Sequence, residues 1–130
     1  MKLLTRIFAI MALATTMCAC GSQPETQTKE QDLSKAVKIV AVFKVKPEYT
    51  HKFADMAREL VLASQAEPGN ITYTLNNCAE DPSTFTFIEM WRDLEAIEAH
   101  NASAHFTKYV PILGGMCESS DVKHYTEVKY

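Results

Sequence analysis

The sequence predicts an α+β fold, and two observations carry this prediction. Segments in which apolar and polar residues alternate, as in strands, are separated by segments with apolar residues at helical spacing. These segments follow the order strand, helix, strand, strand, helix, strand. That order is typical of the ferredoxin-like (split βαβ) arrangement, one antiparallel sheet with both helices on one face.

The folded domain is expected to span residues 36–130, because the preceding chain has a different character. Residues 1–20 begin with two basic residues, continue with an apolar run and end in small residues and cysteines, as a secretory signal does. Cys20 lies among small residues and resembles the acylated cysteine of bacterial lipoproteins; the alternative is an ordinary cleaved signal peptide. Residues 21–35 have no apolar periodicity and predict a disordered tether. We therefore expect a lipid-anchored protein of the bacterial cell envelope.

The charge of the domain bears on its binding partners, and its cysteines bear on disulfide formation. The net charge of the chain is -3, and losing Lys2 and Arg6 with the signal would make it -5. A mildly acidic domain without a basic run argues against nucleic acid as a partner. The domain keeps two cysteines, Cys78 and Cys117, which are either a disulfide of an exported protein or buried free thiols.

The first half of the domain predicts a strand, a helix and a turn. Within residues 36–48, alternate positions from Val37 to Val45 are apolar and Lys38 and Lys44 lie between them, which indicates a strand. Val40 and Val42 make the middle of its second face apolar as well. Apolar residues three and four positions apart predict a helix over residues 49–66. The run Glu67-Pro68-Gly69-Asn70 ends that helix with a turn.

An antiparallel hairpin is predicted next. Residues 70–78 and 84–92 both alternate, and a loop containing Asp81-Pro82 joins them. The second of these strands directs four large side chains to one face: Phe85, Phe87, Glu89 and Trp91.

Two helical pieces follow the hairpin. Asp93 is the expected N-cap of the first piece, with Leu94 and Ile97 as its buried stripe. Ser103 is the expected N-cap of the second piece, which Pro111 limits.

The end of the chain is expected to form a loop over residues 114–121 and a last strand over residues 122–130. On the sheet face away from the helices, an apolar patch is expected at Val40, Val42, Ile88 and Met90. An exposed patch of this kind needs a cover, and a second copy of the chain is the simplest one. We therefore expect a homodimer.

Residues 67–110 resemble the antibiotic biosynthesis monooxygenase domain, in particular its quinol-monooxygenase-like members. The matching positions are Glu67-Pro68-Gly69, Tyr73, Asp81-Pro82, Glu89, Trp91, Asp93 to Glu98, Ala99-His100, and Ser103 with His105-Phe106. The resemblance implies a dimeric α/β barrel with a pocket between sheet and helices in each protomer. It also implies oxygenation of a quinol-like or polyphenolic molecule without metal or flavin. Some relatives degrade haem.

Oxygenation without a cofactor needs a base that removes a phenolic proton, in a site that excludes water. His100 is the first candidate for this base; the alternative is a helix-end histidine paired with a carboxylate. The expected substrate-binding residues are Trp91, Glu89, Tyr73, His105 and Phe106. Glu89 could orient a histidine or face water, Trp91 could be a core residue, and His105 could hold the helix junction.

No metal site is expected at His100 and His105. In a continuous helix, residues five apart point about 140° from each other, so the two histidines would not share an ion. Haem degradation is the weaker alternative, because those relatives use an asparagine that the first strand lacks. A second alternative is an envelope lipoprotein that binds a small molecule without catalysis.

Overall fold

The computed structural model describes residues 32–130. The expected signal peptide, the lipidation site Cys20 and most of the tether lie outside these residues. Over residues 32–130, no helix has the length and apolar character needed to cross a bilayer.

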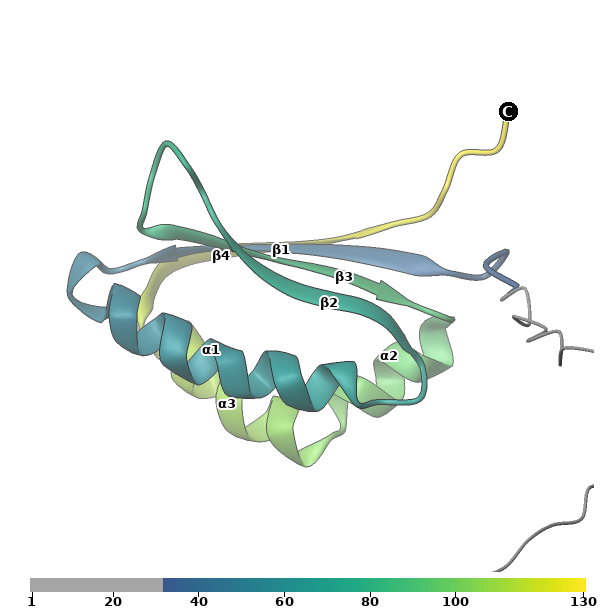
Figure 1. The fold of residues 1–130 in the computed structure, drawn as a ribbon, viewed down its shortest axis with the longest axis horizontal. Helices are drawn as coiled ribbons and strands as arrows, with labels where there is room; N and C mark the ends of the chain where they lie inside the picture. The colour runs from purple at the N-terminus through teal and green to yellow at the C-terminus, as the bar shows by residue number, and fades with distance from the viewer. Residues whose placement is uncertain (1–31) are drawn as a thin grey trace, which may run out of the picture. The chain divides into compact units, whose positions relative to one another are not determined.

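The chain folds into one four-stranded antiparallel sheet with three α-helices. In chain order the elements are β1 (Val37–Val45), the 3-10 turn η1 (Pro47–Tyr49), α1 (Thr50–Gln65), β2 (Asn70–Asn77), β3 (Thr84–Trp91), α2 (Leu94–Asn101), α3 (Ala104–Gly115) and β4 (Cys117–Tyr125). The strand order in the sheet is β2-β3-β1-β4. All three α-helices lie on one side of the sheet (Figure 1). The ferredoxin-like prediction is confirmed, with its second helix split into α2 and α3.

The core lies between the sheet and its helical layer. Phe85, Phe87, Glu89 and Trp91 are all buried on the helix-facing side of β3, as their alternation predicts. Phe53 from α1 contacts the ring of Phe85 at a centroid distance of 5.0 Å. Fully burying one such side chain stabilises the fold by about 2–3 kcal/mol, so this aromatic face holds α1 on the sheet.

The helix caps are as predicted, but the buried stripe of α2 is not. The Asp93 carboxylate accepts a hydrogen bond from the Ala96 amide at 2.8 Å. Ile97 is buried, whereas Leu94 is 61% exposed, so the prediction of a buried Leu94 is wrong. Helical side chains tilt toward the N-terminus, so the first side chain of α2 extends past the end of the helix.

The predicted boundaries after Pro111 are wrong. Helix α3 continues through Pro111 to Gly115, and β4 starts at Cys117, within the stretch expected to be a loop. An internal proline costs a helix about 3 kcal/mol. Burial of Leu113, which is 1% exposed, and of Met116 offsets this cost by about 2–3 kcal/mol each. Neither Cys78 nor Cys117 forms a disulfide within the described residues.

The other face of the sheet carries no helix from residues 32–130 (Figure 1). Val40 lies opposite Ile88 in the β1–β3 register. Ile88 is 45% exposed, and Val40, Val42 and Met90 are half-buried. The apolar patch expected from the sequence is therefore present on this open face.

Candidate functional site

A small cavity of about 40 Å³ lies between the sheet and the helices α1 and α3. Its lining is apolar except for Tyr73 and Glu89; the other lining residues are Ala41, Phe43, Leu60, Phe87, Val110 and Leu113. A space of this size holds about one water molecule. We call this space the interior cavity.

Glu89 is a buried carboxylate that accepts a hydrogen bond from Trp91. It is 6% exposed, and the indole Nε1 of Trp91 donates a hydrogen bond to its Oε2 at 2.8 Å. Burial raises the pKa of Glu89 to about 7, and the negative charge of Glu67 adds to the rise, while hydrogen bonds from Trp91 and Tyr73 oppose it. The side chain can therefore exchange a proton near neutral pH.

Tyr73 completes the polar part of the interior cavity. Its ring meets Trp91 edge-on at a centroid distance of 6.1 Å and Phe87 at 5.8 Å. Burial, together with the charge of Glu89, raises the pKa of the Tyr73 hydroxyl, so the phenol stays neutral. Tyr73 shares the Trp91 side of the sheet, as expected, while Asn76 on the other face is exposed.

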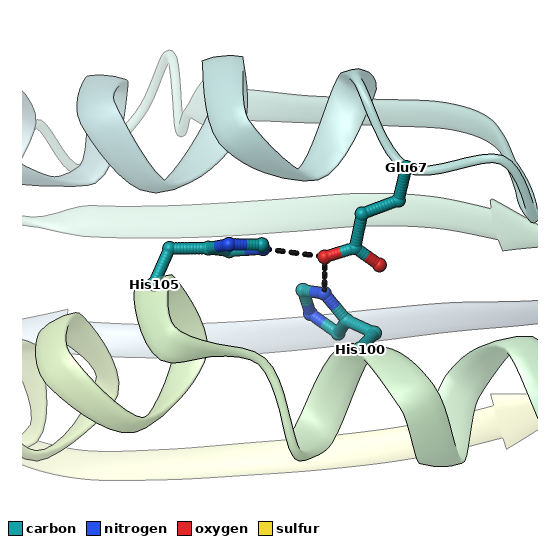
Figure 2. Close-up of side chains that lie close together, drawn as sticks. All are labelled: Glu67, His100 and His105. Atoms are coloured by element: carbon teal, nitrogen blue, oxygen red, sulfur yellow. Dashed lines mark hydrogen bonds and ion pairs between the residues drawn. The ribbon is translucent and has the colours of Figure 1, made fainter.

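A second cluster joins three elements at one end of the helical layer. Glu67 lies in the turn between α1 and β2, His100 in the last turn of α2 and His105 in the first turn of α3. His100 Nδ1 lies 3.0 Å from Glu67 Oε1, and His105 Nε2 contacts the same oxygen. Figure 2 shows both imidazoles directed at this carboxylate. We call these three residues the Glu–His–His cluster.

Backbone hydrogen bonds and a close contact fix the turn that carries Glu67. The Glu67 amide donates to the Ser64 carbonyl at 3.1 Å, and the Arg92 amide donates to the Gly69 carbonyl at 2.9 Å, which ties the turn to the end of β3. A Cβ on Gly69 would overlap the Cβ of Ala96, so only glycine lets this turn pack on α2.

The chain break between the histidines comes from the second N-cap. The Ser103 hydroxyl accepts a hydrogen bond from the Phe106 amide at 3.2 Å, and α3 begins there. The break brings the two imidazole centroids to 5.8 Å. The break predicted at Ser103 is confirmed, so the angle of about 140° that holds for a continuous helix does not apply to His100 and His105.

His100 is held rigidly by its neighbours. It is 1% exposed, with ring centroids at 4.5 Å from Trp91 and 4.9 Å from Phe106. Burial lowers its pKa, although Glu67 acts in the opposite direction. His100 Nε2 has no hydrogen-bond partner within the described residues.

The predicted site residues thus fall into two groups. Tyr73 and Glu89 line the interior cavity, and Trp91 contacts both of them from outside its lining. Phe106 packs on His100 beside Trp91. His100 and His105 do not line that cavity. Glu89 does not orient a histidine, since its partner is the Trp91 indole; that prediction is wrong.

Glu67 orients the histidines instead, and sequence reasoning did not select it as a site residue. One signal was present, because a carboxylate just after the C-terminus of a helix opposes the helix dipole. Such an unfavourable position indicates another use for the side chain. Its partner His100 is 33 residues away, which no local pattern predicts.

A wider groove of about 340 Å³ opens beside the cluster. Glu67 and His105 line it, together with the charged residues Arg92 and Glu95. The groove connects the Glu–His–His cluster to solvent, while the interior cavity lies on the sheet side of the helices.

Comparisons with known proteins agree with this architecture. The model of the family "Antibiotic biosynthesis monooxygenase" matches residues 36–111. The candidate monooxygenase YcnE of Bacillus subtilis (strain 168) is 41% identical over 70 residues, which are 54% of this chain and 74% of YcnE.

Solved structures show the same relationship. A crystal structure of an antibiotic biosynthesis monooxygenase has a TM-score of 0.69 and 33% identity, covering 72% of this chain and 99% of that one. A conserved protein from Methanosarcina mazei Go1 has a TM-score of 0.71 and 27% identity, and the match covers 73% of this chain and 95% of that one. Sequence and fold together lead to one conclusion: the chain belongs to the antibiotic biosynthesis monooxygenase family.

Proposed function

We propose that this protein is a monooxygenase that oxidises a quinol-like or polyphenolic small molecule with O2 at the interior cavity. Family membership and the similarity to YcnE support the monooxygenase class. The observation that carries the proposal is Glu89, a buried carboxylate whose pKa is raised to about 7, in a cavity with aromatic walls. Such a carboxylate can remove a phenolic proton near neutral pH.

The reaction follows from the chemistry of the anion. Glu89 takes the phenolic proton and becomes a carboxylic acid, and the electron-rich anion passes an electron to O2. The two radicals combine into a peroxide anion at a ring carbon, which takes the proton back from Glu89 and becomes a hydroperoxide. Loss of water from the peroxide leaves one oxygen atom on the ring as a quinone carbonyl. The apolar walls exclude bulk water, which protects these intermediates.

The substrate enters by displacing side chains at the rim of the interior cavity. At about 40 Å³ the cavity is smaller than an aromatic ring. Phe43 from β1 and Val110 from α3 line it and are only half-buried. Outward movement of these two side chains gives a flat ring access to Glu89 and Tyr73.

His100 is the alternative base. Its Nδ1 contacts Glu67, which favours the tautomer with a free lone pair on Nε2, and Trp91 lies against its ring. In this alternative the aromatic ring of the substrate binds on the Trp91 side of α2. Glu89 then only positions the substrate.

The test is O2 uptake by purified, chelator-treated protein with a panel of hydroquinones. We expect turnover above the buffer rate, with kcat/KM rising with pH through about 7 as Glu89 loses its proton. No turnover on any member of the panel contradicts the enzyme proposal. Ligand binding without turnover would then favour the small-molecule binder, and tight haem binding with a spectral shift would favour a haem-degrading relative.

A second copy of the chain is proposed to cover the open sheet face. The patch at Val40, Val42, Ile88 and Met90 supports this, because a face of this kind is costly to leave in water. We expect a dimer by multi-angle light scattering and a monomer for Ile88→Lys. The control Val128→Lys changes an exposed apolar residue near the C-terminus and should remain a dimer. Equal masses for both variants would contradict the proposed interface.

Attachment to the bacterial cell envelope through Cys20 is also a proposal, and it rests on the N-terminal sequence alone. Metabolic labelling with an alkyne fatty acid tests it. We expect label in the wild type and in Cys18→Ser, and none in Cys20→Ser. Label that persists in Cys20→Ser would contradict this lipidation site.

A further inference from the structure

We propose that Glu67, His100 and His105 form a binding site for one divalent first-row transition-metal ion. Each residue offers one ligand atom, and these atoms all lie within 4.8 Å of one another (Figure 2). The proposal is independent of the proposed oxygenase chemistry, which takes place at the interior cavity.

The spacing of the donor atoms fits an ion of this class. A four-coordinate ion with bonds of about 2.0–2.2 Å holds neighbouring ligands about 3.3 Å apart. His100 Nδ1 and Glu67 Oε1 are 3.0 Å apart, close to that spacing. Two imidazoles with one carboxylate suit zinc, cobalt, nickel, copper or iron; magnesium and calcium prefer all-oxygen sets.

The two histidines lack other partners for their nitrogens. His105 Nε2 is buried and has no hydrogen-bond partner within residues 32–130, and the Glu67 carboxylate is the group it contacts. His100 Nδ1 has Glu67 alone as its partner. Binding of a cation would release the proton of His100 Nδ1 to solvent, and each of the three ligand atoms would then offer a lone pair to the ion.

The surrounding structure orients the ligands before an ion arrives. His100 is packed between Trp91 and Phe106, and the Ser103 cap fixes the start of α3 two residues before His105. Rigid ligands lose little entropy on binding, which favours affinity. The ion would join the α1–β2 turn to the α2–α3 junction.

An open coordination position is available on the groove side. The groove of about 340 Å³ is lined by Glu67 and His105, so water or an anionic ligand can reach the ion there. A site with three protein ligands and one open position is typical of reactive zinc centres, while structural zinc sites are closed.

The test is titration of chelator-treated protein with Zn2+ by calorimetry and with Co2+ by visible absorption. We expect one ion per chain, micromolar affinity or tighter, and Co2+ bands of a four-coordinate nitrogen and oxygen site. His105→Gln and Glu67→Gln should each weaken binding by about 100-fold or more. The matched control is His124→Gln, an exposed histidine on β4, which should bind as the wild type does.

Two outcomes would overturn the site. One is the absence of micromolar binding by the wild type. The other is equal affinity in His105→Gln and the wild type, which would place the ion on surface histidines. Circular dichroism without metal shows that each variant is folded, and no substrate is used, so the result is independent of the oxygen-uptake test.

Discussion

The two carboxylates Glu89 and Glu67 lie in the same small domain but in opposite surroundings. Glu89 extends from β3 into an apolar cavity, and the Trp91 indole donates a hydrogen bond to it. Glu67 lies in a turn at the edge of the helical layer, where two imidazoles converge on it. The element that carries each carboxylate therefore decides the surroundings in which it acts. A strand places it among apolar side chains that raise its pKa, while a turn lets distant histidines reach it.

The largest expected effect is a difference in turnover between substitutions of the two carboxylates. Glu89→Gln should reduce turnover of metal-free protein by about 100-fold or more, because the amide cannot take the proton. Glu67→Gln should stay within a few-fold of the wild type. Oxygen uptake on an active hydroquinone measures both, with Glu98→Gln as an exposed control. The reverse order of effects would make His100, which Glu67 orients, the base.

The next effect concerns stability against pH. Since burial raises the pKa of Glu89 from 4.5 to about 7, the folded state binds this proton more tightly than the unfolded state. The stabilisation is complete below about pH 4.5 and is lost as pH rises through 7. Glu89→Gln has no carboxyl at this position, so it does not lose this stability as the pH rises. The free energy of unfolding of Glu89→Gln, relative to the wild type, should therefore rise by about 3 kcal/mol between pH 4.5 and pH 8.

Urea denaturation at several pH values measures that difference. Tyr73 and Glu67 are the other titratable groups that act on Glu89, and both are retained in the variant. Tyr73 remains neutral over this range because burial raises its pKa. Parallel stability curves for Glu89→Gln and the wild type would show that the carboxylate is not held in an apolar environment.

Trp91→Phe should have a smaller effect on the same carboxylate. The substitution keeps an aromatic ring beside His100 but removes the only indole donor to Glu89. Because that hydrogen bond favours the charged form, the pKa of Glu89 should rise further and the pH profile of kcat/KM should move to higher pH. We also expect a loss of about 1–3 kcal/mol of stability by urea denaturation at pH 8. An unchanged pH profile would remove Glu89 from the catalytic step.

The smallest effect is expected for His105, a histidine that contacts the other carboxylate, Glu67. His105 is partly exposed, so His105→Gln in metal-free protein should cost only about 0–1 kcal/mol of stability. The same variant should abolish the stabilisation by added Zn2+ that the wild type shows in thermal unfolding. A large loss of stability without metal would mean that the Glu–His–His cluster is a structural network and would weaken the contrast with Glu89.

Local patterns in the sequence predicted a large part of this fold. The alternation from Phe85 to Trp91 needs only a sheet with one covered face, and the caps at Asp93 and Ser103 act within three residues. Patterns of this range can be read without knowing the rest of the chain. The end of the chain was different, because burial of Leu113 carries α3 past Pro111 and pairing with β1 places β4.

The sequence by itself determined the order of the elements, the buried face of β3 and the break between His100 and His105. Only the tertiary structure decided that Glu67 meets both histidines and that Glu89 pairs with Trp91 in a cavity. The physical reason is the distance along the chain over which each interaction acts. Periodicity and capping depend on neighbours along the chain, while the partners and pKa of a carboxylate depend on side chains that folding brings from distant segments.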